Sequence, residues 1–175
     1  MNATFMHRLL AFLVDYVLIL IYLVVVFVVS VFLFPSVQNL FQGSLVVAQL
    51  TGFLIITFPV LLYFIICDSQ LVGQTLGKRK IGIRVVTLHG ESLTVPHSIM
   101  RMILKFLLPW ELSHFFVFRL ANLGDENVPL HITIIGILIY AIVFAYILTT
   151  LFTKKKQSLY DLICRTQVIR VNVKA

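Results

Sequence analysis

Three long runs of apolar residues dominate the chain, and a single charge interrupts them. Residues 9–34 read LLAFLVDYVLILIYLVVVFVVSVFLF, with Asp15 as the charged position, and residues 45–67 and 131–152 contain no Asp, Glu, Lys or Arg. A helix that crosses the hydrocarbon core of a bilayer needs about 20 mostly apolar residues. The pattern therefore predicts three membrane-spanning helices.

A fourth apolar run, residues 101–120, is more polar and includes Lys105, Glu111 and His114. It can span a membrane only if these side chains face protein or water. We nevertheless predict four spans, because four spans place every basic cluster, including the lysines at 154–156, on the cytoplasmic side. Both chain termini are then cytoplasmic, as are residues 68–97 and 153–175.

Two short segments outside the apolar runs alternate between apolar and polar residues. Residues 83–94 resemble a small hairpin with a turn at His89 and Gly90, and residues 167–173 alternate like a strand. Our hypothesis is that the two segments pair in a small cytoplasmic sheet. The predicted fold is a single all-α membrane domain over residues 1–175, with four transmembrane helices and a small cytoplasmic extended and amphipathic element.

Composition and charge agree with this class. Hydrophobic residues make up 60% of the 175 positions and charged residues 12%, whereas soluble domains are about one quarter charged. The formal net charge is +7, but the basic residues lie at the ends of apolar runs, where they fix topology and contact anionic lipid. We therefore expect the lipid bilayer as a partner and no nucleic acid.

The segment GQTLGK at residues 73–78 only superficially resembles a phosphate-binding loop. It has three residues between its glycines where a Walker A motif has four, and Arg79 stands where that motif needs Ser or Thr. The glycines are expected instead to allow a tight turn and a close approach of backbones. No nucleophile with an adjacent base, cofactor motif or metal-ligand cluster is evident, so we predict no enzyme activity, no cofactor and no metal.

Asp15 is the main candidate for function, because an acid inside a bilayer costs a few kcal/mol and needs a partner. Arg8 lies two turns earlier on the same helix face, but its side chain leans toward the N-terminus, away from Asp15. Arg101 and Lys105 lie at the right depth and are the expected partners. Such a pair could serve as an ion or proton site, or it could only fix helix packing.

Two further acids have local partners in the sequence. Glu111 and His114 are three residues apart and share a helix face, so they could relay protons or form a simple hydrogen-bonded pair. Asp161 follows Ser158 by three residues, which resembles a capping box at the start of a short helix. Asp68 lies near an interface and receives no role.

Taken together, the Arg and Asp of the first run, the segment GQTLGKRKIGIRVV and the late segment SLYDLICRTQVI resemble the RDD family of prokaryotic multi-pass membrane proteins. That family is named for one Arg and two Asp, which correspond here to Arg8, Asp15 and Asp161. Arg101 resembles the basic residue that members place at the start of the next helix. The resemblance implies a location in the cell membrane and a role in transport.

Two functions follow as hypotheses. The first is proton-linked transport of a small cation, with Asp15 as the titrating site, Arg101 or Lys105 as its countercharge, and Glu111 with His114 as a relay. Because four helices are few to enclose a path, this function implies a homo-oligomer. The alternative is a membrane scaffold or accessory subunit that transports nothing and binds a different partner chain.

Overall fold

Long apolar helices form most of the computed structural model, which describes residues 1–41, 44–123 and 127–171. Within this part of the chain, three helices are long and apolar enough to cross a membrane: Phe5–Phe32, Val46–Asp68 and Leu130–Phe152. They coincide with the three runs predicted from the sequence. The first is α1 and the third is α8. The second comprises α3 (Leu45–Gly52), the π-helix η1 (Phe53–Thr57) and α4 (Phe58–Asp68).

The fourth run also forms a continuous helical segment, which begins earlier than predicted. It comprises α6 (Val95–Met102), the π-helix η2 (Ile103–Leu107) and α7 (Leu108–Ala121). Helix α6 begins at Val95 because the Thr94 hydroxyl accepts the N–H of His97 at 3.4 Å and Pro96 occupies the first turn. This segment is not among the helices that are apolar enough, by composition, to span.

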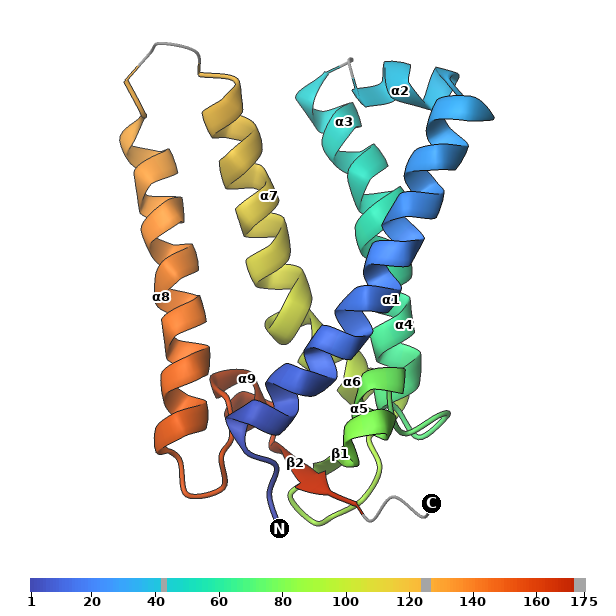
Figure 1. Ribbon diagram of the computed structural model, residues 1–175. Coiled ribbons are helices and arrows are strands. Elements are labelled where there is room, and N and C mark those ends of the chain that lie inside the picture. The colour runs from blue at the N-terminus through green and yellow to red at the C-terminus, as the bar shows by residue number, and fades with distance from the viewer. Residues whose placement is uncertain (42–43, 124–126, 172–175) are drawn as a thin grey trace.

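The helices form two arms that converge at one end of the molecule (Figure 1). Helices α1, α3 and α4 make one arm, with the short α2 (Ser36–Phe41) at its far end, and α7 runs beside α8 in the other. The arms meet where α5 (Leu76–Ile81), α6 and α9 (Leu159–Ile163) lie, next to the N-terminus. The loops and short elements at this end therefore connect the two arms.

Each arm contains a π-helical turn immediately before a proline. Pro59 follows η1 and Pro109 follows η2, and a proline has no N–H to donate to the preceding turn. The tyrosine hydroxyls of the neighbouring helices satisfy carbonyls in both turns: Tyr22 donates to the Ile55 carbonyl at 2.5 Å, and Tyr146 donates to the Leu104 carbonyl. Side chains of adjacent helices thus replace the lost backbone hydrogen bonds, as membrane helices require.

A two-stranded antiparallel sheet lies below the helices. Strand β1 (Ile83–Thr87) pairs with β2 (Thr166–Arg170), which confirms the hypothesis that the two alternating segments pair. The predicted hairpin over residues 83–94 is wrong in its second strand, which does not pair with β1. The chain does turn at Gly90, with φ of 89°, but Leu93 then forms a bridge with Ser69, because β2 already pairs with β1. The predicted strand at 167–173 extends past the last described residue.

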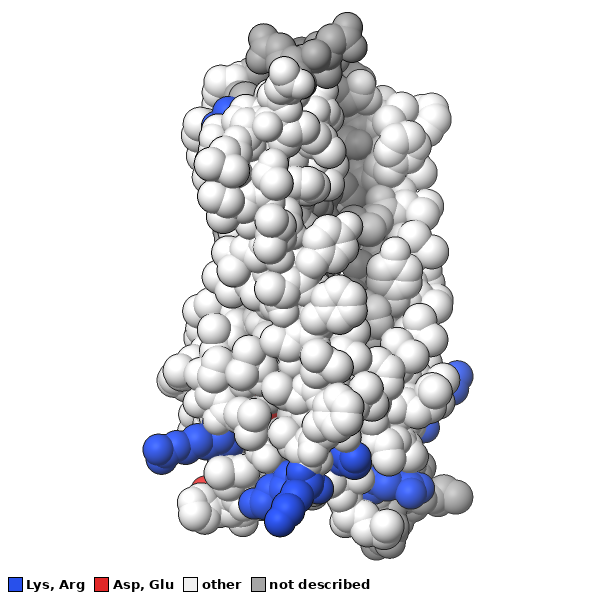
Figure 2. Space-filling model, turned by 90° about the vertical axis from the view of Figure 1, so that its left-hand side faces the viewer, with Lys and Arg blue, Asp and Glu red and all other residues white. Residues whose placement is uncertain are grey.

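Charged side chains concentrate at the end that holds the sheet. In Figure 2 most of the visible Lys and Arg side chains gather at this lower end, while the long sides of the helices are almost uncharged. Large apolar side chains on α1, such as Val17, Ile21 and Phe27, are more than half exposed. These exposed apolar surfaces are what a lipid-facing helix needs, because lipid tails are as apolar as the side chains themselves.

Candidate functional site

Asp161 is the centre of a buried charge network where the two arms meet. Its carboxylate is fully buried and accepts hydrogen bonds from Arg8 Nη1 at 2.5 Å and from Arg101 Nε and Nη2 at 3.0 and 2.8 Å. Asp161 also accepts the Ser158 backbone N–H at 3.4 Å, so the predicted capping-box contact is confirmed. The sequence thus assigned Asp161 a local role, whereas its larger role is to neutralise two arginines.

The electrostatic balance at Asp161 favours the charged carboxylate. Burial by itself would raise the pKa of Asp161, but the charges and hydrogen bonds of Arg101 and Arg8 outweigh it and lower the pKa to about 2. Asp161 is therefore ionised at any physiological pH. A group held so firmly in one charge state is suited to structure and not to proton exchange.

Asp68 extends the network, and the sequence analysis missed it. Arg101 Nη1 donates to Asp68 Oδ2 at 3.2 Å, and the Lys78 ammonium donates to the other carboxylate oxygen. Burial lowers the pKa of Lys78 to about 8, with Asp68 acting in the opposite direction. The available signal was position: Asp68 follows the second apolar run at the membrane edge, and Arg101 stands at the start of the fourth run, residues 101–120.

Asp15 has a different kind of environment from the other two buried aspartates. Its carboxylate accepts hydrogen bonds from the Tyr63 hydroxyl at 2.9 Å, the Thr75 hydroxyl at 2.6 Å and the Gly77 backbone N–H at 2.8 Å. The expected ion pair with Arg101 is wrong, because the guanidinium of Arg101 is bound to the other two aspartates. Uncharged donors therefore hold the Asp15 carboxylate.

Helix α5 supplies two of these donors because it folds back against α1. Thr75 caps α5 by accepting the Lys78 N–H at 3.2 Å, which places its hydroxyl beside Asp15. Gly77 allows the close approach: a Cβ added there would lie 2.0 Å from the Ala11 carbonyl oxygen. The expectation that the glycines of GQTLGK permit a turn and a close backbone approach is confirmed, with Gly73 at φ of 89°.

Arg8 behaves as its position on the helix suggested. Its side chain extends away from Asp15, toward the N-terminal end, and binds Asp161 and the Lys156 carbonyl, the latter at 2.6 Å. Its Nε is buried and makes no hydrogen bond within the described residues. Of the two aspartates that the resemblance groups with Arg8, only Asp161 contacts it.

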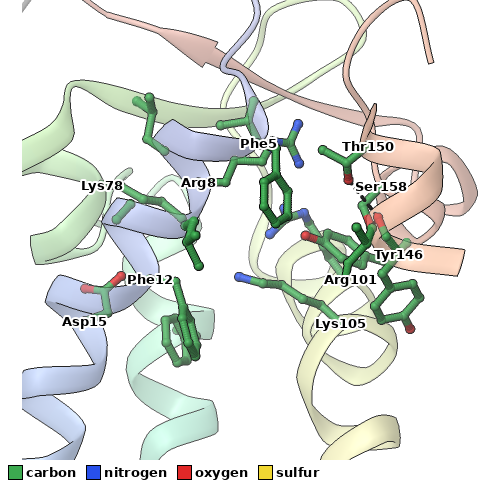
Figure 3. A pocket seen from close by; sticks show the side chains of 17 residues that line it. Phe5, Arg8, Phe12, Asp15, Lys78, Arg101, Lys105, Tyr146, Thr150 and Ser158 are labelled. Atoms are coloured by element: carbon green, nitrogen blue, oxygen red, sulfur yellow. Dashed lines mark hydrogen bonds between the residues drawn. The ribbon is translucent and has the colours of Figure 1, made fainter. Parts of the chain in front are cut away.

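Lys105 projects into a cavity of about 350 Å³ between the two arms. This "charged cavity" is lined in part by Arg8, Asp15, Lys78, Arg101 and Lys105. Figure 3 shows the Lys105 side chain reaching across the cavity toward Phe12 on α1. Its ammonium lies 5.4 Å from the centre of the Phe64 ring, and no hydrogen bond to it is found in the described part of the chain. The predicted pairing of Lys105 with Asp15 is thus not a direct contact, although both line one cavity.

A second cavity, of about 340 Å³, continues along the helices away from the charged end. This "apolar cavity" is lined mainly by side chains such as Tyr16, Ile19, Leu23 and Val60. Phe12 and Lys105 belong to the lining of both cavities. The two cavities therefore adjoin each other at these residues.

The structure does not bring Glu111 and His114 together. Glu111 accepts the Thr57 hydroxyl at 2.8 Å, and Thr57 in turn accepts the indole N–H of Trp110 at 3.1 Å. His114 is exposed and packs on Trp110, with ring centres 4.5 Å apart. No hydrogen bond joins Glu111 to His114 among the residues described, so the geometry needed for a direct relay is not present.

A comparison with known protein families identifies the family of the chain. The sequence matches the RDD family over residues 2–165, a range that contains Arg8, Asp15 and Asp161. Neither the curated proteins nor the solved structures searched contain a match to the chain. The family match covers nearly the whole sequence, and the chain belongs to the RDD family.

Proposed function

We propose that this protein is a proton-linked transporter of a small cation in the cell membrane, with Asp15 as the exchanging carboxylate. The observation that carries the proposal is the environment of Asp15. Asp68 and Asp161 are each bound by two cationic side chains, whereas Asp15 is held by three uncharged donors. A proton or a cation can therefore reach Asp15 without the loss of an ion pair.

The charged cavity supplies the surroundings for such an exchange. Asp15 lies in its wall, opposite Lys105, and the other cations of the wall are engaged with Asp68 and Asp161. Lys105 then acts as the mobile countercharge: its flexible stem lets the ammonium approach Asp15 when the site is empty and withdraw when a cation binds. Arg101 is fixed and plays no such role.

The proposal includes four membrane spans and cytoplasmic termini. Helical segment α6–η2–α7 accounts for the fourth span, because it runs beside α8 and its Glu111 and Lys105 face protein, not lipid. The basic residues gather at the end that holds the sheet, and the positive-inside rule places that end in the cytoplasm. Four helices are few to surround a path, so the transporter is proposed to work as a homo-oligomer.

A scaffold or accessory subunit is the second candidate, and one observation favours it. The chain of ion pairs from Arg8 through Asp161, Arg101 and Asp68 to Lys78 joins five separate elements, which is what a purely structural network would do. In a scaffold, Asp15 would serve only to hold α5 against α1.

Flux measurements on purified protein in proteoliposomes distinguish the two candidates. A pH gradient should drive uptake of Na⁺ or K⁺, and Asp15→Asn should abolish it, because the amide keeps the size and most hydrogen bonds of the carboxylate but cannot exchange a proton. Glu111→Gln serves as the matched control, since Glu111 is bound to Thr57 outside the charged cavity and its loss should leave flux intact. Equal flux from a folded Asp15→Asn protein would reject the proposal.

A further inference from the structure

The charged and apolar cavities together form a cleft with two chemically different ends. The charged end contains two donor groups that find no acceptor within the described residues: the Lys105 ammonium and the buried Arg8 Nε. The Asp15 carboxylate contacts neither of them in the structure, and its hydrogen bonds come from Tyr63, Thr75 and Gly77. The charged end therefore has hydrogen-bond donors without an acceptor, and it suits a ligand with a negatively charged acceptor group.

The apolar end has the opposite character. Two polar side chains line it, Thr57 and Ser113, and each makes its hydrogen bond within the protein, to Glu111 and to the Pro109 carbonyl. The rest of its lining, apart from the shared Lys105, is apolar or aromatic. A space of about 340 Å³ with such walls favours a hydrocarbon chain over water.

The cleft is accessible from the surface that would face lipid. Phe12 and Tyr16, which line the apolar cavity, are 44% and 46% exposed on α1. Lys105 stands where the two cavities adjoin, so a negative group bound to it would lie at the charged end with space for an attached chain at the apolar end (Figure 3). This order matches an amphiphile whose charged head is nearer the basic end of the molecule.

We propose that the cleft binds one anionic amphiphile, a membrane lipid with a phosphate-containing headgroup. The phosphate binds Lys105 in the charged cavity, and one acyl chain occupies the apolar cavity beside Trp110. The basic end of the molecule draws anionic lipid toward this site. The proposal shares Lys105 with the proposed transport site, but it concerns occupancy of the cleft, which is measured without flux, so either proposal can fail without the other.

Trp110 provides a direct probe, since it is the single tryptophan of the chain and lines the apolar cavity. Protein in a neutral maltoside detergent is titrated with phosphatidylglycerol carrying brominated acyl chains, which quench nearby indole fluorescence. We expect saturable quenching with a midpoint about tenfold lower than for phosphatidylcholine with the same chains, because the choline ammonium of phosphatidylcholine cancels the phosphate charge and is repelled by the basic end of the molecule. Inorganic phosphate in large excess should not reverse it.

Substitutions at the two ends test each part of the site. Lys105→Met should raise the phosphatidylglycerol midpoint to that of phosphatidylcholine, while Lys80→Met, which removes an exposed lysine at the same end, should leave it unchanged. Leu23→Phe fills the apolar cavity and should weaken quenching by both lipids, whereas Leu20→Phe on the exposed face of α1 should not. Leu23→Phe keeps every charge, so it tests the site even where Lys105→Met does not fold.

Three results would overturn the proposal. Equal midpoints for the two lipids would show that the cleft does not prefer an anionic headgroup. Reversal of quenching by inorganic phosphate would mean that the cleft is a site for a free anion. An unchanged lipid preference in folded Lys105→Met, or unchanged quenching in Leu23→Phe, would place the bound lipid elsewhere on the protein.

Discussion

Arg8 Nη1 donates to Asp161 Oδ2 across 2.5 Å, although the two residues are separated by 153 positions in the chain. Arg8 belongs to the first helix and Asp161 to the last, and Arg101 of α6 binds the same carboxylate. The contact therefore joins the two arms of the molecule at their common end. In a bilayer, the contact requires that Arg8 and Asp161 lie on the same side.

Removal of Asp161 should destabilise the protein strongly, because it leaves two buried guanidinium groups with fewer counter-ions. Asp161→Asn is expected to lower the free energy of unfolding by about 3–5 kcal/mol, the range for breaking one side of a buried ion pair. Denaturant unfolding in detergent measures it. Glu91→Gln removes an exposed acid at the same end and should change stability little; a loss below about 1 kcal/mol for Asp161→Asn would indicate a solvated pair.

The lowered pKa of Asp161 predicts a specific pH dependence of stability. The pKa is about 2 in the folded protein against 3.8 for an unperturbed Asp, so the unfolded chain binds the proton more readily between these values. The stabilisation, about 2 kcal/mol, is present above pH 4 and is lost as the pH falls from 3.8 toward 2.

Arg8→Gln tests the cause of this dependence. The substitution removes one of the two cations that lower the pKa of Asp161, so the folded-state pKa should rise toward the unperturbed value. The acid-dependent loss of stability should still begin near pH 4, but it should be smaller and should be complete at a higher pH than in the wild type. Unfolding curves between pH 2 and 6 for both proteins give the comparison. Identical acid profiles would mean that Arg8 does not stabilise the charged carboxylate.

The membrane helices could be predicted from the sequence because their length and apolar character follow from the thickness of a bilayer. The same holds for the contact of Ser158 with Asp161, which depends on local spacing, and for the close approach at the glycines of residues 73–78. These features depend on neighbouring positions in the chain. The sequence therefore contains enough information to locate them.

The partners of Asp15 and Asp68 could not be predicted in this way. The pairing of cations with acids depends on how α5 folds back against α1. That placement results from the cap at Thr75 and the close contact at Gly77, and helix periodicity does not predict it. The charge pattern indicated Arg101 or Lys105 as the partner of Asp15, whereas the donors in the structure are two hydroxyls and a backbone amide. Uncharged donors carry no signal in a charge pattern.

Gly77→Ala should disrupt the contact between α5 and α1. The added Cβ would meet the Ala11 carbonyl oxygen at 2.0 Å, and because that atom is backbone, the two helices must separate. We expect a loss of about 1–3 kcal/mol in stability, as for other overpacked sites, together with loss of the hydrogen bonds to Asp15.

Gly52→Ala is the matched control for this substitution. Its added Cβ would meet only the Phe41 ring, at 3.9 Å, and alanine favours a helix over glycine by up to about 1 kcal/mol. Gly52→Ala should therefore be neutral or stabilising in thermal unfolding. Equal stability of the two variants would contradict the close packing of α5 on α1.

The tyrosine hydroxyls that cap the two π-helical turns should each contribute to stability. Tyr22→Phe removes the donor to the Ile55 carbonyl and leaves that group unsatisfied beside Pro59, at an expected loss of about 1–3 kcal/mol. Tyr16→Phe, on the same helix and 46% exposed, should have little effect. If Tyr22→Phe and Tyr16→Phe unfold at the same midpoint temperature in detergent, the Ile55 carbonyl must find another donor.

The proposed topology predicts opposite accessibility for the two ends of the helices. Cys164 is buried, so its failure to react would say nothing about its side of the membrane. Single cysteines are therefore placed at the exposed positions Ser36 and Lys155 in a protein with Cys67 and Cys164 replaced by Ser. Ser36 lies at the end of α1 far from the termini, whereas Lys155 follows α8 near the basic end.

A membrane-impermeant maleimide added to intact cells should label Ser36→Cys and should label Lys155→Cys only after the cells are permeabilised. The expected pattern follows from the basic residues that gather at the Lys155 end, which the positive-inside rule keeps in the cytoplasm. Ser36 and Lys155 lie on opposite sides of the membrane only if an odd number of spans separates them, and α6–η2–α7 is the third such span. Labelling of both positions in intact cells would therefore mean that the α6–η2–α7 segment does not cross the membrane. Since Arg8 and Asp161 bind each other in the folded protein, such a result would also require that the ion pair between the two arms be broken in the membrane.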